Sequence, residues 1–132
     1  MSEQRIIPYL AYDDAPAAIT FLCEAFGFTE RFRMPTKDGR IGHAEVAYRD
    51  NIVMLASTWR VAGAASPRDL AGVHTQLHCT VDDVDAHYER AREAGATIIG
   101  APADQPHGTR MYRAVDPEGH RWIFGSPIAA KK

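Results

Sequence analysis

The feature that most limits the possible folds is an order of elements that the sequence uses twice. Each time, an apolar strand is followed by an Asp-Asp pair, an amphipathic helix that ends at a glycine, and three further strands. The two Asp-Asp pairs begin at Asp13 and Asp82, 69 positions apart, and the glycines are Gly27 and Gly95. Aspartate is a favoured residue before a helix and glycine a favoured residue after one. Few letters agree between the copies, so the repeat lies in the pattern.

The strands and the linker follow from the same pattern. Apolar alternation and β-branched residues predict strands at residues 6–12, 28–34, 41–48 and 51–57 in the first copy and at 76–81, 96–99 and 109–124 in the second, with a Pro-rich loop at 100–108. Residues 58–72 are rich in small residues, Gly and Pro, which is typical of a linker. We therefore divide the single domain, 1–132, into a first module (5–57), a linker (58–72) and a second module (73–127).

The clearest hairpin lies in residues 109–124, TRMYRAVDPEGHRWIF. Asp116-Pro117-Glu118-Gly119 supplies the turn, because proline fixes φ and glycine is free to adopt φ > 0. Trp122 and Phe124 alternate with Arg121 and Ile123, so one face of the last strand should be buried.

These elements predict an α+β fold of two paired βαβββ modules, which form a cupped sheet with the helices on the outside. Each module needs a second layer to bury its sheet, and the helix supplies that layer on one face. Two such repeats can pair edge to edge, and their inner faces then enclose a cleft.

Alternation along the strands selects the side chains that should line this cleft. A two-residue turn between residues 48 and 52 would place His43 and Glu45 beside Met54. The predicted ligand-binding set is Tyr9, His43, Glu45, Met54, Gln76, His78, Arg110 and Tyr112, above a floor with Ile7 and Ile123. Buried polar groups without partners are costly, so this many of them indicates a binding cleft, whereas any single one could be a solvated strand residue.

Composition excludes several classes of partner. The chain has 15 basic and 17 acidic residues, a formal charge of -2, and no basic run beyond Lys131-Lys132, which argues against nucleic acid. No apolar run reaches the roughly 20 residues of a membrane span, and the N-terminus lacks the apolar core of a signal peptide. We expect a cytoplasmic protein, with Cys23 and Cys79 as free thiols and with His87 and His120 at the surface.

The sequence resembles the vicinal oxygen chelate superfamily of glyoxalases, bleomycin-resistance proteins and dioxygenases, and in particular its small single-domain members. The segments that carry the resemblance are YDDAPAAITFLCEAFGF (12–28), GHAEVAYRDNIVML (42–55), VDDVDAHYERAREAGA (81–96) and RAVDPEGHRWIFG (113–125). The resemblance implies the paired βαβββ fold. Its members isomerise, hydrolyse, oxygenate or merely bind, so it does not fix an activity.

Metal-dependent relatives hold a divalent ion on the first and fourth strands of each module. The matching positions here are Ile7, Met54, Gln76 and Ile123, and Gln76 alone carries a good ligand atom. We therefore expect no metal cofactor at these positions. A displaced site of His43, Glu45 and His78 stays open as an alternative, since such a trio could hold a divalent metal.

Three functions remain compatible with the sequence. The first is a metal-free protein that binds a small aromatic or amphipathic molecule and serves in resistance or sequestration. Arg110 would meet an anionic oxygen of the ligand, and Tyr9 and Tyr112 would stack on its apolar body. The second is a lyase or isomerase of carbonyl compounds, using a displaced metal or a His/Glu acid-base group. The third is a dimeric fold with a vestigial cleft. No catalytic residue can be named.

Two further expectations concern assembly and the linker. Open sheet edges favour a homodimer, in which the modules pair either within or between chains. Trp59 in the linker is either a hydrophobic plug or a flap over a ligand.

Overall fold

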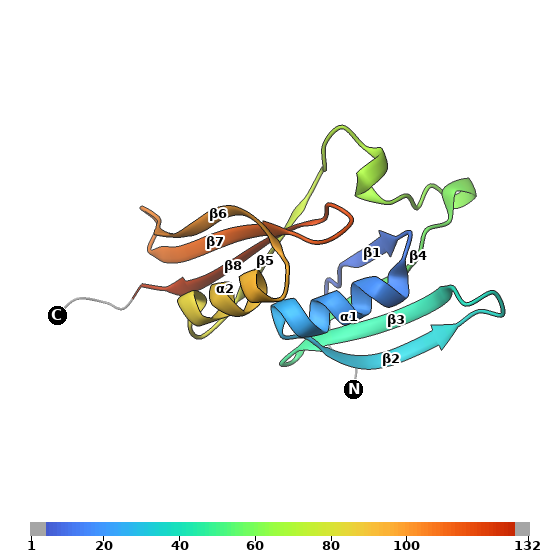
Figure 1. The fold of residues 1–132 in the computed structure, drawn as a ribbon, viewed down its shortest axis with the longest axis horizontal. Coiled ribbons are helices and arrows are strands. Elements are labelled where there is room, and N and C mark those ends of the chain that lie inside the picture. The colour runs from blue at the N-terminus through green and yellow to red at the C-terminus, as the bar shows by residue number, and fades with distance from the viewer. Residues whose placement is uncertain (1–4, 129–132) are drawn as a thin grey trace.

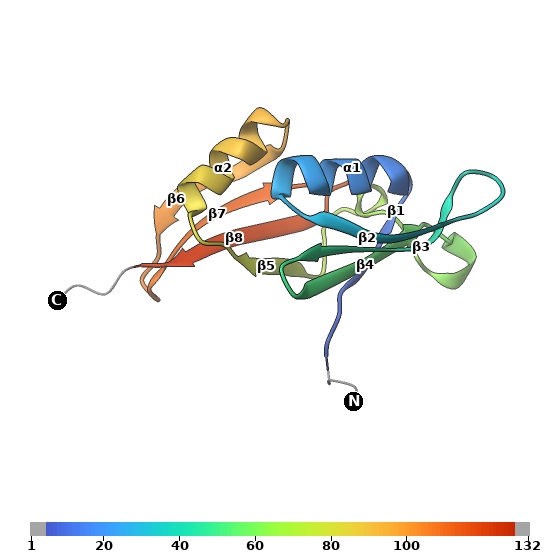
Figure 2. The same ribbon diagram turned by 90° about the horizontal axis from the view of Figure 1, so that it is seen from below.

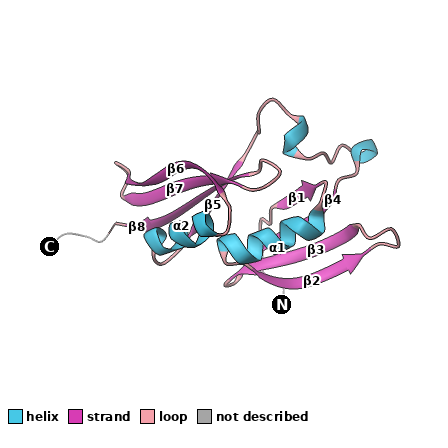
Figure 3. Ribbon diagram, viewed as in Figure 1, coloured by secondary structure: helices cyan, strands magenta, loops and turns pink. Residues whose placement is uncertain are grey.

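The computed structural model describes residues 5–128, which contain two α-helices, two short 3-10 helices and two four-stranded sheets (Figures 1 and 3). The first module has β1 (Tyr9–Tyr12), α1 (Ala15–Phe26), β2 (Thr29–Pro35), β3 (Ile41–Tyr48) and β4 (Asn51–Ser57). The second has β5 (Gln76–Thr80), α2 (Val84–Glu93), β6 (Thr97–Asp104), β7 (Thr109–Val115) and β8 (Arg121–Pro127). The strand orders are β1-β4-β3-β2 and β5-β8-β7-β6. The predicted α+β class is confirmed.

Both helices begin and end at the residues that the sequence marks. The Asp14 side chain accepts the backbone N–H of Ala17 at 3.1 Å, and the Asp83 side chain accepts that of Ala86 at 3.1 Å. Gly27 ends α1 in the left-handed conformation, φ 82°, which a residue with a side chain adopts at a cost. The caps satisfy backbone groups that a helix end leaves without intrahelical partners.

The two modules meet through their helix layers. Helices α1 and α2 contact each other and lie on the same side of the sheets (Figure 2), whereas no strand of one sheet pairs with a strand of the other within residues 5–128. Phe26 and Phe28 of the first module pack against Trp122 and Phe124 of the second, with ring centroids 4.7 to 5.6 Å apart. The core therefore lies under the helices, and the opposite face of each sheet is left open.

The last hairpin has a connection one residue longer than the expected turn. Val115 pairs with Arg121, so five residues, 116–120, join the strands, and Tyr112 stands opposite Phe124. A shift of one residue sends every side chain of a strand to the other face of the sheet. The predicted orientation of Arg110 and Tyr112 is therefore wrong, and both belong to the helix-covered face.

Strand β6 is longer than expected. It continues to Asp104 through Pro102, in a stretch predicted to be a loop. Proline cannot donate to a neighbouring strand, but β6 is an edge strand with an irregular register, where proline is tolerated.

Two histidines expected at the surface are packed instead. His87 is buried, with Nε2 donating to the carbonyl of Phe26 at 2.8 Å and Nδ1 accepting from the Tyr112 hydroxyl at 2.6 Å. His120 is half-buried, and its Nε2 donates to the carbonyl of Ala11 at 2.9 Å. Each histidine belongs to the second module and bonds to a backbone carbonyl of the first module, so each links the two modules.

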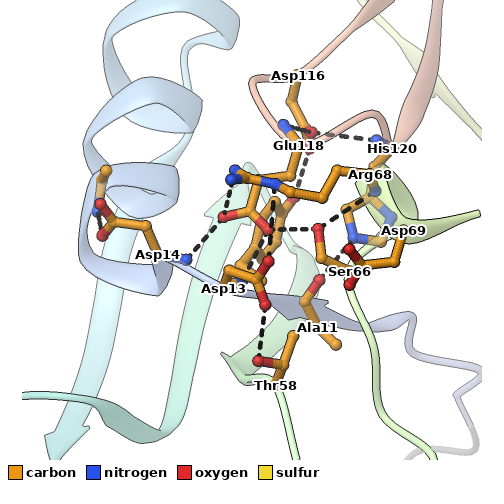
Figure 4. A network of polar contacts seen from close by, with 12 residues as sticks. Ala11, Asp13, Asp14, Thr58, Ser66, Arg68, Asp69, Asp116, Glu118 and His120 are labelled. Carbon is orange, nitrogen blue, oxygen red and sulfur yellow. Dashed lines mark hydrogen bonds and ion pairs between the residues drawn. The ribbon is translucent and has the colours of Figure 1, made fainter. Parts of the chain in front are cut away.

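The linker is held to both modules by a network of polar contacts (Figure 4). It contains two short 3-10 helices, at Arg60–Ala62 and Pro67–Asp69. The buried carboxylate of Glu118 accepts the Ser66 hydroxyl at 2.6 Å and the backbone N–H groups of Asp13 and Asp14 at 2.6 and 2.7 Å, while Arg68 lies 3.4 Å away. This one side chain ties the last hairpin, the start of α1 and the linker together.

Candidate functional site

The open face of the first sheet carries a mixture of polar and apolar side chains. Glu45 on β3 stands opposite Met54 on β4, and Met54 stands beside Tyr9 on β1, so these three share one face. His43 lies on the same face as Glu45, two residues along β3. The orientation expected for these four residues agrees with the strand register. Their role in ligand binding stays a prediction.

Strand β2 adds two side chains that the sequence analysis missed. Phe32 pairs with Glu45 and Met34 pairs with His43, so both lie on the open face, where their exposed fractions are 48% and 50%. The Phe32 ring lies 6.0 Å from the His43 ring. Large apolar side chains this exposed typically mark a contact surface. Phe32 and Met34 alternate with Arg33 in the sequence, and this period of two could have predicted their shared face, although the register shifts between Glu30 and Phe32.

Three polar side chains on this face are joined in a row. The Tyr9 hydroxyl lies 2.8 Å from Nδ1 of His43, and Nε2 of His43 lies 3.1 Å from Oε2 of Glu45. The Tyr9 and His43 rings also meet edge to face, with centroids 5.4 Å apart. The row is accessible, since the side chains of His43 and Glu45 are 24% and 30% exposed.

A cavity of about 840 Å³ adjoins Tyr9. It is an open hollow lined by the β2–β3 loop, the end of β4 and the start of the linker, and Tyr9 and Trp59 are its aromatic lining residues. Its other lining residues are Thr36, Lys37, Asp38, Arg40, Ile41, Gly42, Ala56, Ser57, Thr58 and Ala64. Cavities of a few hundred to a thousand Å³ that combine aromatic walls with a few charges are typical of small-molecule sites.

The charges at this cavity sum to one positive charge. Lys37 and Arg40 are cations, and Asp38 is the single acidic residue among the lining side chains. The Thr36 hydroxyl, which donates to the Asp38 carboxylate, together with the backbone N–H of Arg40 lowers the pKa of Asp38. The carboxylate is thus held by Thr36 and by the Arg40 backbone within its own loop.

Trp59 reaches this cavity from an ordered segment of the linker. Its backbone exchanges two hydrogen bonds with Ala64, at 2.8 and 3.1 Å, and Arg40 donates to the carbonyl of the preceding Thr58. The indole is nevertheless 67% exposed. The backbone of Trp59 is fixed and most of its side-chain surface is in solvent, so a ligand can bury this aromatic surface on binding.

The open face of the second sheet carries a different set. Gln76, His78 and Ile123 share this face, as expected, and Arg113 occupies the place predicted for Arg110. Gly125 lies under the His78 ring, where an added Cβ would be 3.2 Å from Nε2 and 2.8 Å from Thr109 Cγ2. A side chain at position 125 would displace His78 or Thr109, so glycine permits this packing.

Arg110 and Tyr112 do not reach either open face. Arg110 pairs with Asp85 on α2 at 3.0 Å and with Asp104 at 3.2 Å, and these carboxylates raise its pKa. Tyr112 is 1% exposed beside His87, and burial raises its pKa. Both residues stabilise the packing of α2 on the second sheet.

The metal positions of the resembling family do not fit a divalent cation here. Ile7, Met54 and Ile123 offer no nitrogen or oxygen side-chain ligand. The alternative trio is not assembled either, because among residues 5–128 no three His, Cys, Asp or Glu side chains are close enough to hold a metal ion. His43 and Glu45 form a pair on the first sheet, whereas His78 lies on the second.

A second cavity, of about 710 Å³, lies at the junction of the two modules. Its walls include Phe28, Trp122, His78 and Cys79. Burial raises the pKa of the Cys79 thiol to about 11, so the group is protonated at neutral pH and is a poor nucleophile.

The comparisons with known proteins agree with this architecture. The model of the Glyoxalase/Bleomycin resistance protein/Dioxygenase superfamily matches residues 5–124. The chain belongs to this superfamily. The predicted family is therefore confirmed.

Similar proteins include members of known structure. The crystal structure of TioX from Micromonospora sp. ML1 is 36% identical, covers 98% of this chain and 100% of its own, and superposes with a TM-score of 0.73. A glyoxalase-related enzyme from Fulvimarina pelagi is 22% identical over 98% of this chain and 94% of its own, with a TM-score of 0.72, and supports the fold alone. The Mycobacterium tuberculosis protein Rv0887c is 40% identical over 96% of this chain and 76% of its own length.

No helix among residues 5–128 is long and apolar enough to cross a membrane.

Proposed function

We propose that this member of the superfamily binds a small aromatic molecule with an anionic group in the cavity between Tyr9 and Trp59. The observation that carries the proposal is the pair of exposed aromatic side chains, Tyr9 and Trp59, which are 56% and 67% exposed and line one cavity of about 840 Å³. Aromatic rings stack on each other with about 0.5–1.5 kcal/mol beyond the gain from buried area. The apolar open face, with Phe32 and Met34, can extend the contact.

The anionic group is supported by the charges at the cavity. Lys37 and Arg40 both line it, and the Asp38 carboxylate is engaged by Thr36 and the Arg40 backbone. A ligand carboxylate would therefore be attracted by the net positive charge of the cavity. A neutral ligand of the same shape would lack this electrostatic attraction and bind more weakly. Sequestration of such a molecule needs no chemical step and no metal ion.

A homodimer remains a prediction from the sequence, as does a cytoplasmic location. The open faces of both sheets support the dimer, because within residues 5–128 no strand of one sheet covers the other. A second copy could place its second sheet, with Gln76 and His78, across the first sheet of its partner. Light scattering after size-exclusion chromatography measures the mass and decides between one and two chains.

Isothermal titration calorimetry with 1-naphthoic acid and 1-naphthol tests the proposed binding. We expect the naphthoate to bind and the naphthol, which lacks the carboxylate, to bind more weakly. Trp59→Ala should weaken naphthoate binding about 10-fold, equivalent to about 1.4 kcal/mol. Val61→Ala is the matched control, because Val61 is 95% exposed on the same segment and does not line the cavity. Equal losses in both variants, or no heat of binding with the unmodified protein, would contradict the proposal.

A further inference from the structure

The cavity of about 710 Å³ at the junction of the two modules is separate from the proposed binding cavity. Among the described residues, the two cavities share no lining residue. The junction cavity is lined by the segment before β1, by the β3–β4 turn with the start of β4, and by β5. Its volume lies within the range of small-molecule sites. It can therefore hold a ligand of its own, and the residues that line it indicate which kind.

The most buried residues of the junction cavity are apolar. Phe28, Val53 and Trp122 are 5%, 7% and 1% exposed, and all three belong to the hydrophobic core. Leu77 and Cys79 also line the cavity, and they pair with Trp122 and Phe124 on β8, so they share the helix-covered face. The cavity thus reaches the core at the seam between the two sheets, which sets it apart from the open sheet faces.

The aromatic rings at this cavity are already packed against one another. Phe28 lies edge to face against both Tyr48 and Trp122, with ring centroids 5.7 and 5.5 Å apart. These contacts occupy ring surface that an aromatic ligand would need for stacking. The other apolar lining residues are aliphatic, namely Ile6, Ile7, Pro8, Ile52, Val53 and Leu77. Such a lining suits an aliphatic chain better than a ring.

The β3–β4 turn brings two cations to the junction cavity. Arg5 donates from Nη1 to the backbone carbonyl of Asp50 at 3.3 Å, and Arg49 is the neighbouring residue of that turn. Both arginines line the cavity, and Asp50 is the one acidic residue among its described lining residues, so the charges sum to one positive charge. Two guanidinium groups at one turn repel each other, and a bound anion would offset this repulsion.

Arg49 has a backbone conformation that glycine adopts more easily. Its φ is 57°, and between residues 5 and 128 no other residue with a side chain has a positive φ. Its guanidinium pairs with Asp82 of the second module, but the two side chains are 55% and 82% exposed. An exposed ion pair contributes little stability. The pair therefore does not by itself offset the strained backbone, and a ligand carboxylate can replace Asp82 at little cost.

We propose that the junction cavity binds a long-chain carboxylate, with the aliphatic chain against Val53 and Leu77 and the carboxylate at Arg49. Such a ligand combines an apolar chain for the buried part of the cavity with one negative charge for the β3–β4 turn. The inference goes beyond the proposed function, because the cavity and the class of ligand are both different. The two cavities can be occupied at the same time, since they share no described lining residue.

Isothermal titration calorimetry with decanoate, kept below its micelle-forming concentration, tests this proposal. We expect decanoate to bind. Hexanoate should bind more weakly because its chain buries less apolar surface, and 1-decanol should bind more weakly because it has no charge. Absence of a heat of binding with decanoate, or equal affinities for decanoate and 1-decanol, would overturn the proposal.

Arg49→Asn separates the charge of this residue from its backbone conformation. Asparagine tolerates positive φ, so the turn should be kept while the cation is lost. The affinity for decanoate should fall about 10-fold, as for the loss of one hydrogen-bonded charge, and that for 1-decanol should not change. Arg31→Asn is the matched control, because Arg31 is exposed on β2 and lines neither of these two cavities. Unchanged affinity for decanoate in Arg49→Asn would contradict the role of this arginine.

Trp59→Ala shows which cavity decanoate occupies and separates this inference from the proposed function. The variant should bind naphthoate more weakly and decanoate as the unmodified protein does. If decanoate affinity falls with that of naphthoate, decanoate binds beside Trp59 and the inference is wrong. If naphthoate binds and decanoate does not, the inference fails and the proposed function stands. If decanoate binds with the expected response to Arg49→Asn and naphthoate does not bind, the proposed function fails and the inference stands.

Discussion

The carboxylate of Glu118 accepts the backbone N–H of Asp14 at 2.7 Å, and Asp14 is the N-cap residue of α1. A turn of the second module is therefore hydrogen-bonded to the N-terminus of the first helix. The same carboxylate accepts the N–H of Asp13 and the hydroxyl of Ser66. Because Ser66 belongs to the linker that also carries Trp59, one buried side chain joins the packing of the modules to the wall of the proposed binding cavity (Figure 4).

Glu118→Gln should destabilise the protein by about 2 kcal/mol. The amide is neutral, and it replaces an acceptor atom with a donor that faces other donors, so at least one buried N–H or O–H loses its partner. Urea unfolding at neutral pH measures the change. Glu89→Gln is the control, because Glu89 forms an exposed pair with Arg92 on α2, and its unfolding midpoint should not move. Equal midpoints for Glu118→Gln and the unmodified protein would contradict the role of this carboxylate.

Much of the fold could be predicted because local signals agreed with the tertiary arrangement. The caps at Asp14 and Gly27, and the strands Ile41–Tyr48 and Asn51–Ser57, are where the sequence places them. Propensity, hydrophobic alternation and turn residues all indicate the same elements there.

The missed features depend on single-residue details or on distant partners. The connection in the last hairpin includes His120, whose ring donates to Ala11 more than a hundred residues away, and this extra residue reversed the predicted face of Tyr112. His87 is a polar residue on a helix. Nothing in the neighbouring sequence shows that its ring will be buried and will donate a hydrogen bond to the Phe26 carbonyl. The position of Trp59 at the cavity depends on the path of the linker. A loop has no repeating pattern of apolar residues from which this path could be predicted.

The stability of the protein should fall as the pH drops through about 6.5, and His87 should contribute to the slope. Burial lowers the pKa of His87 below the ordinary value of 6.5, although the Phe26 carbonyl opposes the shift. The unfolded chain therefore takes up a proton on this side chain at a higher pH than the folded chain does. The free energy of unfolding then decreases with falling pH, by at most about 1.4 kcal/mol per pH unit from this group.

Urea titrations between pH 7.5 and 5 measure this slope. His87→Gln keeps a donor for Phe26 and an acceptor for Tyr112 but cannot titrate, so its free energy of unfolding should depend less on pH. His74→Gln is the control, because His74 is exposed just before β5 and its replacement should leave the slope unchanged. The same slope in His87→Gln and the unmodified protein would refute this assignment.

Cys79 should react slowly with alkylating agents at pH 8. Its pKa is raised to about 11 by burial, so only a small fraction is thiolate at that pH. Iodoacetamide labelling of a Cys23→Ser variant, followed by mass spectrometry, isolates Cys79, and the rate should increase with pH up to about 11. The same variant unfolded in urea provides the reference, because an exposed thiol has its pKa near 8.5. Labelling of the folded protein as fast as the unfolded protein at pH 8 would show that the thiol is not shielded.

Arg110 and Tyr112 should have no part in ligand binding, contrary to the expectation from the sequence. Tyr112→Phe removes the hydroxyl that donates to His87 and should lower the free energy of unfolding by about 1 kcal/mol. Arg110→Ala breaks pairs with Asp85 and Asp104 on the helix-covered face, away from the cavity beside Tyr9. Calorimetry should give both variants the naphthoate affinity of the unmodified protein, whereas Trp59→Ala binds about 10-fold more weakly. A comparable loss in Arg110→Ala would place the ligand near β7 instead, because only there could this guanidinium reach it.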